Sequence, residues 1–251
     1  RVAVFFADIQ YYLCRRDRQA VQDNLRVICG PDATIVPLSK AVFRNFGKYL
    51  SEFFGVRHTL KQSFVDQVTV ENRQRLDEAL ARGKGVIIMT AHIGNWEMGG
   101  LVLGRIGYPM VAVVLPHKER RVNELFNEQR KLGGVTVVPV QMAIRRCLHA
   151  LKNNEIVALL ADRDFSATGR LMTFFGKPTM IPRGAAMFAY RTGAAVLPMF
   201  LVRERQGRFR IVIDEAFNLP EGRGVMDEET FTDCFMKQQV SMLERTIRRY
   251  P

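Results

Sequence analysis

Short apolar runs alternate with amphipathic stretches over most of the chain. Each run has the length of a buried strand, and roughly a dozen helix-compatible residues separate most runs from the next. Strands that are apolar on both sides of the pleat are typical of a parallel sheet covered by helices on both faces. The expected strands are residues 86–90, 110–115, 135–140, 156–161, 194–202 and 209–213. The pattern predicts an α/β fold with a mostly parallel central sheet flanked by helices.

Both ends of the chain carry helical patterns. The N-terminal region is first apolar and aromatic and then amphipathic, with apolar residues at helical spacing. The last amphipathic stretch ends in a basic turn, which complements the helix dipole. Helices are expected over residues 4–13, 18–28, 38–54 and 227–249. Between these ends, the last two strands are expected to form a hairpin through Gln206 and Gly207.

No internal repeat, Gly/Ser linker or break in composition divides the sequence. We therefore expect a single domain over residues 1–251, made of an N-terminal helical part (1–55) and an α/β core (56–251). With 47% hydrophobic and 25% charged residues, the composition is that of a globular protein and excludes an intrinsically disordered chain. No apolar run reaches the length of about 18 residues that a membrane-spanning helix requires.

The net charge and the spacing of the cysteines further limit the kinds of partner and of structural site that the protein can have. The 37 Lys and Arg residues against 25 Asp and Glu give a net charge of +12, which favours a polyanionic partner. Nucleic acid, an anionic membrane, and an acidic protein or lipid all meet that description. The four cysteines lie far apart, so neither a disulfide framework nor a structural zinc site is expected.

The most informative segment follows the expected strand 86–90, because ligands of open α/β sheets bind at the carboxyl ends of strands. His92 lies just past that end. If Gly94 and Asn95 make a turn and a helix starts there, Glu97 falls in its first turn and folds back toward His92. The carboxylate then fixes the imidazole tautomer, as in the base half of a catalytic triad. The same spacing is equally typical of a loop histidine beside a solvated acid.

Two other segments contain charged residues that are candidates for binding a substrate. Arg130 closes a basic amphipathic segment downstream of a strand end, which suits phosphate groups. Asp162, Arg163 and Asp164 follow another strand and either position a substrate, hold Arg130, or form a salt-bridged turn. No Ser or Cys stands beside His92, so the nucleophile is expected to be a hydroxyl of the substrate.

Residues 92–97 (HIGNWE) resemble the H-x4-D/E motif of the lysophospholipid acyltransferase superfamily. More narrowly, they are similar to the H-F-G-N-W-E form found in the late acyltransferases of lipid A biosynthesis and in relatives that acylate phosphatidylinositol mannosides. The resemblance continues in order across most of the chain. It covers Asn24–Arg26, Asn123–Arg130, Ala161–Asp164, Phe174–Pro178, Arg183–Gly184 and Arg191–Pro198.

The resemblance implies a glycerol-3-phosphate acyltransferase-like fold and a definite chemistry. A fatty acyl chain would move from an acyl carrier protein or coenzyme A thioester to a hydroxyl of a glycolipid such as a lipid A precursor. A phosphatidylinositol mannoside is the alternative acceptor. His92 and Glu97 would form the base dyad, and no metal or redox cofactor is needed. The substrate-binding residues would be Asn95, Arg130, Asp162, Arg163 and Asp164.

Partners and location follow from the same resemblance. The positive charge suits an acidic carrier protein, an anionic glycolipid and a membrane surface, and we expect the cytoplasmic face of the cell inner membrane. A membrane helix is expected before Arg1. Aromatic residues of the opening helix could rest at the membrane interface; they are Phe5, Phe6, Tyr11 and Tyr12. The aromatic and methionine residues 172, 174, 175, 180 and 187 either line an acyl tunnel or belong to the core.

Three other functions compete with acyl transfer. A nucleic-acid binder is disfavoured, because the sequence shows no recognisable module and its basic residues are spread along the chain. A hydrolase that activates water with His92 and Glu97 stays open, since the missing G-x-S-x-G motif excludes only a serine nucleophile. A non-catalytic lipid-binding relative is disfavoured by the intact His92 and Glu97.

Overall fold

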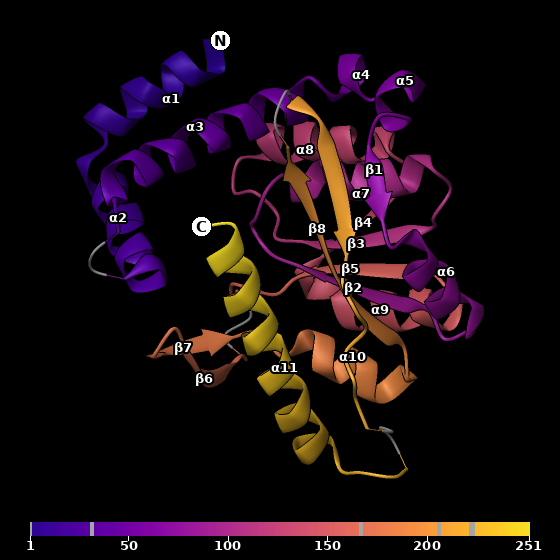
Figure 1. The fold of residues 1–251 in the computed structure, drawn as a ribbon. Helices are drawn as coiled ribbons and strands as arrows, with labels where there is room; N and C mark the ends of the chain where they lie inside the picture. The colour runs from indigo at the N-terminus through magenta and orange to yellow at the C-terminus, as the bar shows by residue number, and fades with distance from the viewer. Residues whose placement is uncertain (1, 31–32, 166–167, 205–206, 221–223) are drawn as a thin grey trace.

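A central sheet with helices on both faces forms the body of the protein in this computed structural model (Figure 1). The structure describes residues 2–30, 33–165, 168–204, 207–220 and 224–251. The predicted N-terminal helices are confirmed and pack against one another at one side of the sheet. They are α1 (Val2–Leu13), α2 (Arg15–Cys29) and α3 (Ile35–Phe54), followed by the short α4 (Val56–Thr59) and α5 (Gln62–Val65).

The main sheet has seven strands in the order β1-β9-β8-β2-β5-β3-β4. All neighbours pair in parallel except β8 and β9, which confirms the mostly parallel sheet. The strands are β1 (Thr69–Glu71), β2 (Val86–Thr90), β3 (Met110–Val114), β4 (Val135–Pro139), β5 (Ile156–Leu160), β8 (Ala195–Arg203) and β9 (Phe209–Ile213). The expected antiparallel pairing of the last two strands is confirmed, although Gln206 of its turn lies outside the described residues.

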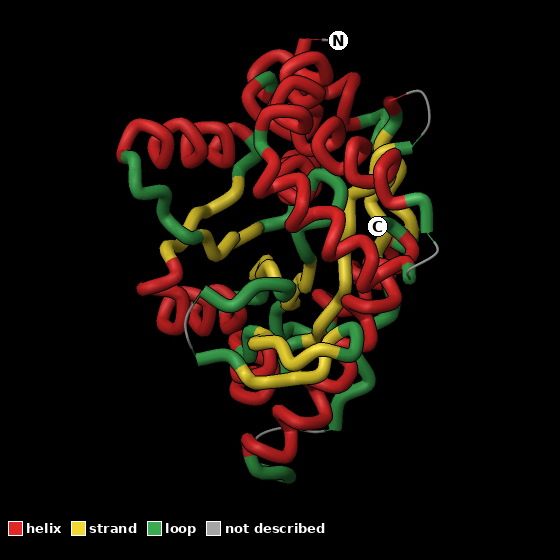
Figure 2. Tube along the Cα trace, turned by 90° about the vertical axis from the view of Figure 1, so that its left-hand side faces the viewer, coloured by secondary structure: helices red, strands yellow, loops and turns green. Residues whose placement is uncertain are grey.

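Each face of the sheet is covered by its own set of helices (Figures 1 and 2). One face packs on α6 (Arg73–Ala81), α7 (Trp96–Arg105) and α8 (Arg120–Leu132). The other packs on α9 (Ala143–Lys152), which follows the turn η1 (Val140–Met142), and on α10 (Gly184–Thr192) and α11 (Glu228–Arg249). The predicted last helix is confirmed, and Asp227 caps it by accepting from the Thr230 backbone N–H at 2.9 Å.

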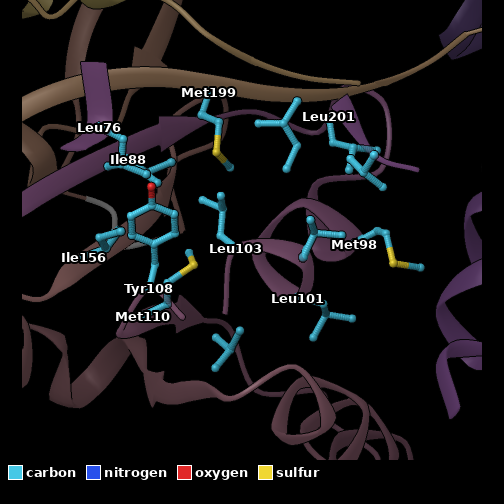
Figure 3. Packing of buried hydrophobic residues seen from close by; sticks show 14 of the residues in the cluster. Leu76, Ile88, Met98, Leu101, Leu103, Tyr108, Met110, Ile156, Met199 and Leu201 are labelled. Atoms are coloured by element: carbon cyan, nitrogen blue, oxygen red, sulfur yellow. The ribbon is translucent and has the colours of Figure 1, made fainter. Parts of the chain in front are cut away.

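Strand β2 explains why the predicted strands appear in the sequence as continuous apolar runs. Ile88 belongs to the core cluster under α7 and α8, part of which Figure 3 shows, whereas Ile87 and Met89 belong to the cluster on the opposite face. Successive residues of a strand point to opposite faces, so a strand buried on both sides must be apolar throughout. Because β2 lies in the middle of the sheet, the position of the segment that begins after Thr90 is set by the core.

A separate hairpin, β6 (Arg170–Phe174) and β7 (Lys177–Ile181), was not predicted from the sequence. Its strands are only partly buried, so they lack the continuous apolar run that marks the main sheet. Phe175 and Gly176 make the turn, both with positive φ (49° and 75°). Within the described residues, no helix combines the length and the apolar composition that crossing a bilayer demands.

Candidate active site

The segment between β2 and α7 turns sharply and brings His92 to the carboxyl edge of the sheet. Gly94 has φ +65°, and a Cβ at this position would lie 1.9 Å from the Leu201 carbonyl oxygen. Only glycine fits both the conformation and the close approach to β8. Asn95 then caps α7, because its Oδ1 accepts from the Met98 backbone N–H at 3.1 Å. The predicted turn and helix start are confirmed.

His92 is held by Asp162, which follows the neighbouring strand β5. The imidazole Nδ1 lies 3.0 Å from both carboxylate oxygens, and the His92 backbone N–H donates to Asp162 Oδ2 at 3.2 Å. A carboxylate can only accept, so Nδ1 carries the hydrogen and Nε2 of the neutral ring is an acceptor. The side chain of His92 is 30% exposed, and no described residue occupies its Nε2. This arrangement leaves the Nε2 nitrogen available to accept a proton from a bound molecule.

Glu97 pairs with Arg130 in a more buried setting. Arg130 Nε and Nη2 donate to the two oxygens of Glu97 at 2.9 and 2.5 Å, and the side chains are only 9% and 13% exposed. Arg130 Nη1 also donates to Asn127 Oδ1 at 3.3 Å, and the guanidinium lies over the Phe126 ring. The fork geometry of the guanidinium matches the carboxylate, which locks α7 to α8.

The structure corrects the expected direct contact between Glu97 and His92. Both oxygens of Glu97 face Arg130 because α7 packs against α8, whereas Asp162 emerges beside His92 because β5 is the neighbour of β2. The alternative in which Asp162 holds Arg130 is wrong for the same reason. The site therefore contains two pairs, His92 with Asp162 and Glu97 with Arg130.

The remaining sequence candidates have different surroundings. Asn95 is 2% exposed, and both groups of its amide are engaged, since Nδ2 donates to Glu52 Oε2 at 2.9 Å. These contacts hold the loop, and the substrate contact expected for Asn95 stays a prediction. Asp164 Oδ2 accepts from the Gly169 backbone N–H at 2.9 Å. Arg163 is exposed and lies over the Phe165 ring.

Two residues of α3 that no sequence pattern indicated, Tyr49 and Glu52, also reach the site. Tyr49 stacks on Trp96 with ring centroids 4.5 Å apart, and Trp96 meets the His92 ring edge-on at 4.7 Å. Burial, followed by the nearby charge of Glu97, raises the pKa of Tyr49, so the phenol stays neutral. Glu52 contacts Asn95 as described. In the sequence, the only hint of a role for these residues was their spacing: Glu52 follows Tyr49 by three positions on the same predicted helix and stands next to Phe53.

Comparison with known proteins identifies the family. The family model described as bacterial lipid A biosynthesis acyltransferase matches residues 2–251. The chain belongs to this family. It is 31% identical over 212 residues to a phosphatidylinositol mannoside acyltransferase of Mycobacterium tuberculosis, covering 81% of this chain and 67% of that protein. It is 26% identical to the lipid A biosynthesis acyltransferase of Haemophilus influenzae, over 92% of this chain and 76% of that one.

The chain is also similar to one further sequence relative and to one solved structure. The lipid A biosynthesis palmitoleoyltransferase of Escherichia coli is 25% identical, over 96% of this chain and 76% of that protein. The crystal structure of the 1-acyl-sn-glycerophosphate acyltransferase PlsC from Thermotoga maritima aligns with a TM-score of 0.40 at 14% identity, covering 98% of this chain and 94% of that one.

A cavity of the acyltransferase lies away from this site. It measures about 500 Å³ and lies where β2 and β8 begin, with Lys84, Arg191 and Phe217 among its lining residues. None of the site residues lines it. The residues considered for an acyl tunnel pack differently: Met172 and Phe174 are partly buried against the core, and Met180 is 44% exposed. The tunnel stays a prediction.

Proposed function

We propose that the protein transfers a fatty acyl chain from an acyl thioester to a hydroxyl of a glycolipid, with His92 as the general base. The supporting observation is a histidine whose side chain is 30% exposed and whose Nδ1 is held by Asp162, while no described residue forms a hydrogen bond with its Nε2. Because no Ser or Cys stands beside His92, the acceptor hydroxyl itself attacks the thioester. Donor and acceptor then bind together, and ping-pong kinetics would contradict the proposal.

The proton moves from the acceptor to His92 and on to the leaving group. Nε2 takes the hydroxyl proton as the oxygen attacks the thioester carbonyl carbon. A tetrahedral intermediate forms with a negative oxygen. When the carbon–sulfur bond breaks, the imidazolium returns the proton to the thiolate, which leaves as a free thiol. Asp162 keeps the ring in the required tautomer and stabilises the imidazolium that forms in between.

We assign the stabilisation of the negative oxygen to backbone N–H groups at the start of α7. The first turn of a helix has N–H groups with no partner inside the helix, and the dipole adds to their positive potential. Arg130 as a whole residue is 7% exposed, and its Nε and Nη2 already donate to Glu97. We therefore assign Arg130 to holding Glu97 and α7, rather than to the contact with substrate phosphate expected from the sequence.

The donor and the acceptor are each proposed by chemical class. An acyl carrier protein or coenzyme A thioester provides the acyl group, and the acceptor is an anionic glycolipid. The relatives named above favour two acceptors, a lipid A precursor and a phosphatidylinositol mannoside. The net charge of +12 attracts the phosphate groups of all these molecules. Arg163, exposed next to Asp162, is the proposed contact for the acceptor.

We further propose that α1 rests on an anionic membrane surface, at the cytoplasmic face of the inner membrane. Phe5, Phe6 and Tyr12 are 62%, 63% and 64% exposed, and Leu13 is 77% exposed. Aromatic and aliphatic side chains on one helix are typical of interfacial binding. The expectation is corrected for Tyr11, which is buried and whose hydroxyl lies 3.2 Å from Ser39 Oγ.

Thiol release tests the reaction directly. Acyl carrier protein and coenzyme A thioesters are supplied with and without a lipid A precursor or a phosphatidylinositol mannoside. The parent should release thiol only when an acceptor is present. His92→Ala should reduce the rate by about a hundredfold or more, with unchanged circular dichroism. His58→Ala is the matched control, because this histidine is exposed on α4 and has no hydrogen bond or ring contact with a site residue among the described residues.

The other outcomes are equally informative. Thiol release with free fatty acid at the same rate with and without acceptor would establish a hydrolase and overturn the transferase proposal. This alternative has one observation in its favour, namely that the exposure of His92 admits water. Release that ignores both acceptor and His92→Ala would overturn the general-base assignment.

A further inference from the structure

Helix α3 supports the segment that carries His92 with two neighbouring side chains. Tyr49 stacks on Trp96, which in turn meets His92 edge-on. One turn further along α3, Glu52 reaches Asn95, the cap of α7. Both contacts fall within the short stretch between His92 and the first residues of α7. The N-terminal helical region is thus part of the framework of the site.

Glu52 sits between that cap and the end of β8. Its Oε2 accepts from Asn95 Nδ2 at 2.9 Å and from Arg203 Nη2 at 2.6 Å, while Oε1 lies 2.5 Å from Arg203 Nη1. The side chains of Glu52 and Arg203 are 20% and 24% exposed, so water screens the pair only in part. Two residues before Arg203, the Leu201 carbonyl accepts from the Asn95 backbone N–H at 3.0 Å.

These contacts fix the orientation of one amide group. A planar amide has its oxygen and nitrogen on opposite sides, so Asn95 can cap α7 with Oδ1 only when Nδ2 points toward an acceptor. Glu52 is that acceptor, and Arg203 fixes the position of the Glu52 carboxylate. Without it, Asn95 can flip its amide and present a donor to the Met98 N–H, which removes the cap.

We propose that Glu52 is a positioning residue for acyl transfer, which acts through Asn95 on the orientation of His92. The proposal rests on the proposed function, since it assigns a role in that same reaction. Glu52 does not touch the reacting atoms. It keeps the segment 92–95 in the conformation that places Nε2 where an acceptor hydroxyl must lie, and a displacement of about 1 Å at such a position lowers rates by up to about a hundredfold.

Glu52→Gln is the first test, because it keeps the size of the side chain and removes the charge. We expect kcat to fall about tenfold while KM for donor and acceptor stays within about twofold. Glu71→Gln is the matched control: Glu71 also pairs with an arginine of the sheet, Arg210, but on β1 at the far edge. The control should keep kcat within about twofold. A Glu52→Gln variant with parental kcat would overturn the proposal.

A reciprocal exchange separates positioning from simple stabilisation. Asn95→Asp still caps the helix, but it cannot donate to Glu52 and repels it, so we expect kcat to fall by about tenfold or more. Combining it with Glu52→Gln restores a donor–acceptor pair in the opposite sense, because the new glutamine amide can donate to the new carboxylate. We expect the double variant to recover part of the lost kcat. A double variant at or below the Asn95→Asp rate would contradict the proposal.

Trp96 gives a second readout that does not depend on activity. It is the only tryptophan of the chain and lies against both Tyr49 and His92. Acrylamide should quench its fluorescence more strongly in folded Glu52→Gln than in the parent or in Glu71→Gln. If thiol release shows no acyl transfer in the parent, the proposed function fails, whereas the quenching result still decides whether Glu52 holds the segment. Where no acyl transfer can be measured, unchanged quenching in Glu52→Gln would by itself overturn the positioning role.

Discussion

The two carboxylates of the site lie in different surroundings. Glu97 and its partner Arg130 are 13% and 9% exposed and joined by two hydrogen bonds. Asp162 and His92 are 17% and 30% exposed, and one ring nitrogen remains open. A buried carboxylate with both oxygens paired to a guanidinium has little freedom to contact a bound molecule, whereas an imidazole with one nitrogen not hydrogen-bonded can accept from one. The first pair is suited to hold the frame and the second to carry the chemistry.

The largest expected effect comes from removing Arg130. Arg130→Met keeps an apolar stem of similar length but leaves Glu97 buried and unpaired. We expect the free energy of unfolding to fall by about 3–5 kcal/mol, measured by urea denaturation. Arg120→Met on the same helix is the control, since Arg120 and Glu124 form an exposed pair and should contribute less than about 1 kcal/mol. A similar loss in both variants would show that the pair with Glu97 does not hold the frame.

Asp162→Asn should lower activity while leaving stability nearly unchanged. The asparagine amide can donate to Nδ1 and select the wrong tautomer of His92, so we expect kcat to fall by about a hundredfold, which corresponds to about 2.7 kcal/mol. Thiol release and urea denaturation are measured on the same preparation. An active variant would mean that Asp162 does not orient the base.

Glu97→Gln distinguishes the observed pairing from the one expected from the sequence. In the structure this substitution weakens the contact with Arg130, so the free energy of unfolding should fall by about 1–2 kcal/mol. If Glu97 instead oriented His92, the same substitution would reduce kcat as strongly as Asp162→Asn and leave stability unchanged. Comparing the two variants in both assays decides between the arrangements.

The smallest effect is expected at Thr90, the last residue of β2. Its hydroxyl is buried and meets no partner among the described residues. Thr90→Val replaces the hydroxyl with a methyl group of nearly the same shape. The free energy of unfolding should therefore stay the same or rise by up to about 1 kcal/mol. A clear loss of stability would show that the hydroxyl contributes to the native state.

The sequence predicted local features of the site well, because their causes are local. The apolar run of β2, the Gly94–Asn95 turn and the first turn of α7 depend on neighbouring residues, and His92 was placed correctly at the strand end. The mostly parallel sheet followed from the repeated apolar runs. The hairpin β6–β7 was missed because its strands are only partly buried and lack such a run.

The pairing of the charged residues was not predictable, because it depends on spatial order. Asp162 meets His92 only because β5 is placed next to β2, although β3 and β4 come between them along the chain. Arg130 meets Glu97 only because α7 and α8 pack together. Spacing within one segment made Glu97 the obvious partner of His92. Glu52 lay in a helix whose position over the site no local pattern indicates.

The sequence separation of these contacts also sets the order in which the protein can regain activity. His92 and Asp162 are 70 positions apart, and Glu52 and Arg203 are 151 apart. Contacts between distant segments form late, because the chain must first close long loops. On refolding from denaturant, helical circular dichroism should therefore return before thiol release does. Recovery of enzyme activity therefore reports the late formation of the contacts among the central strands and α3.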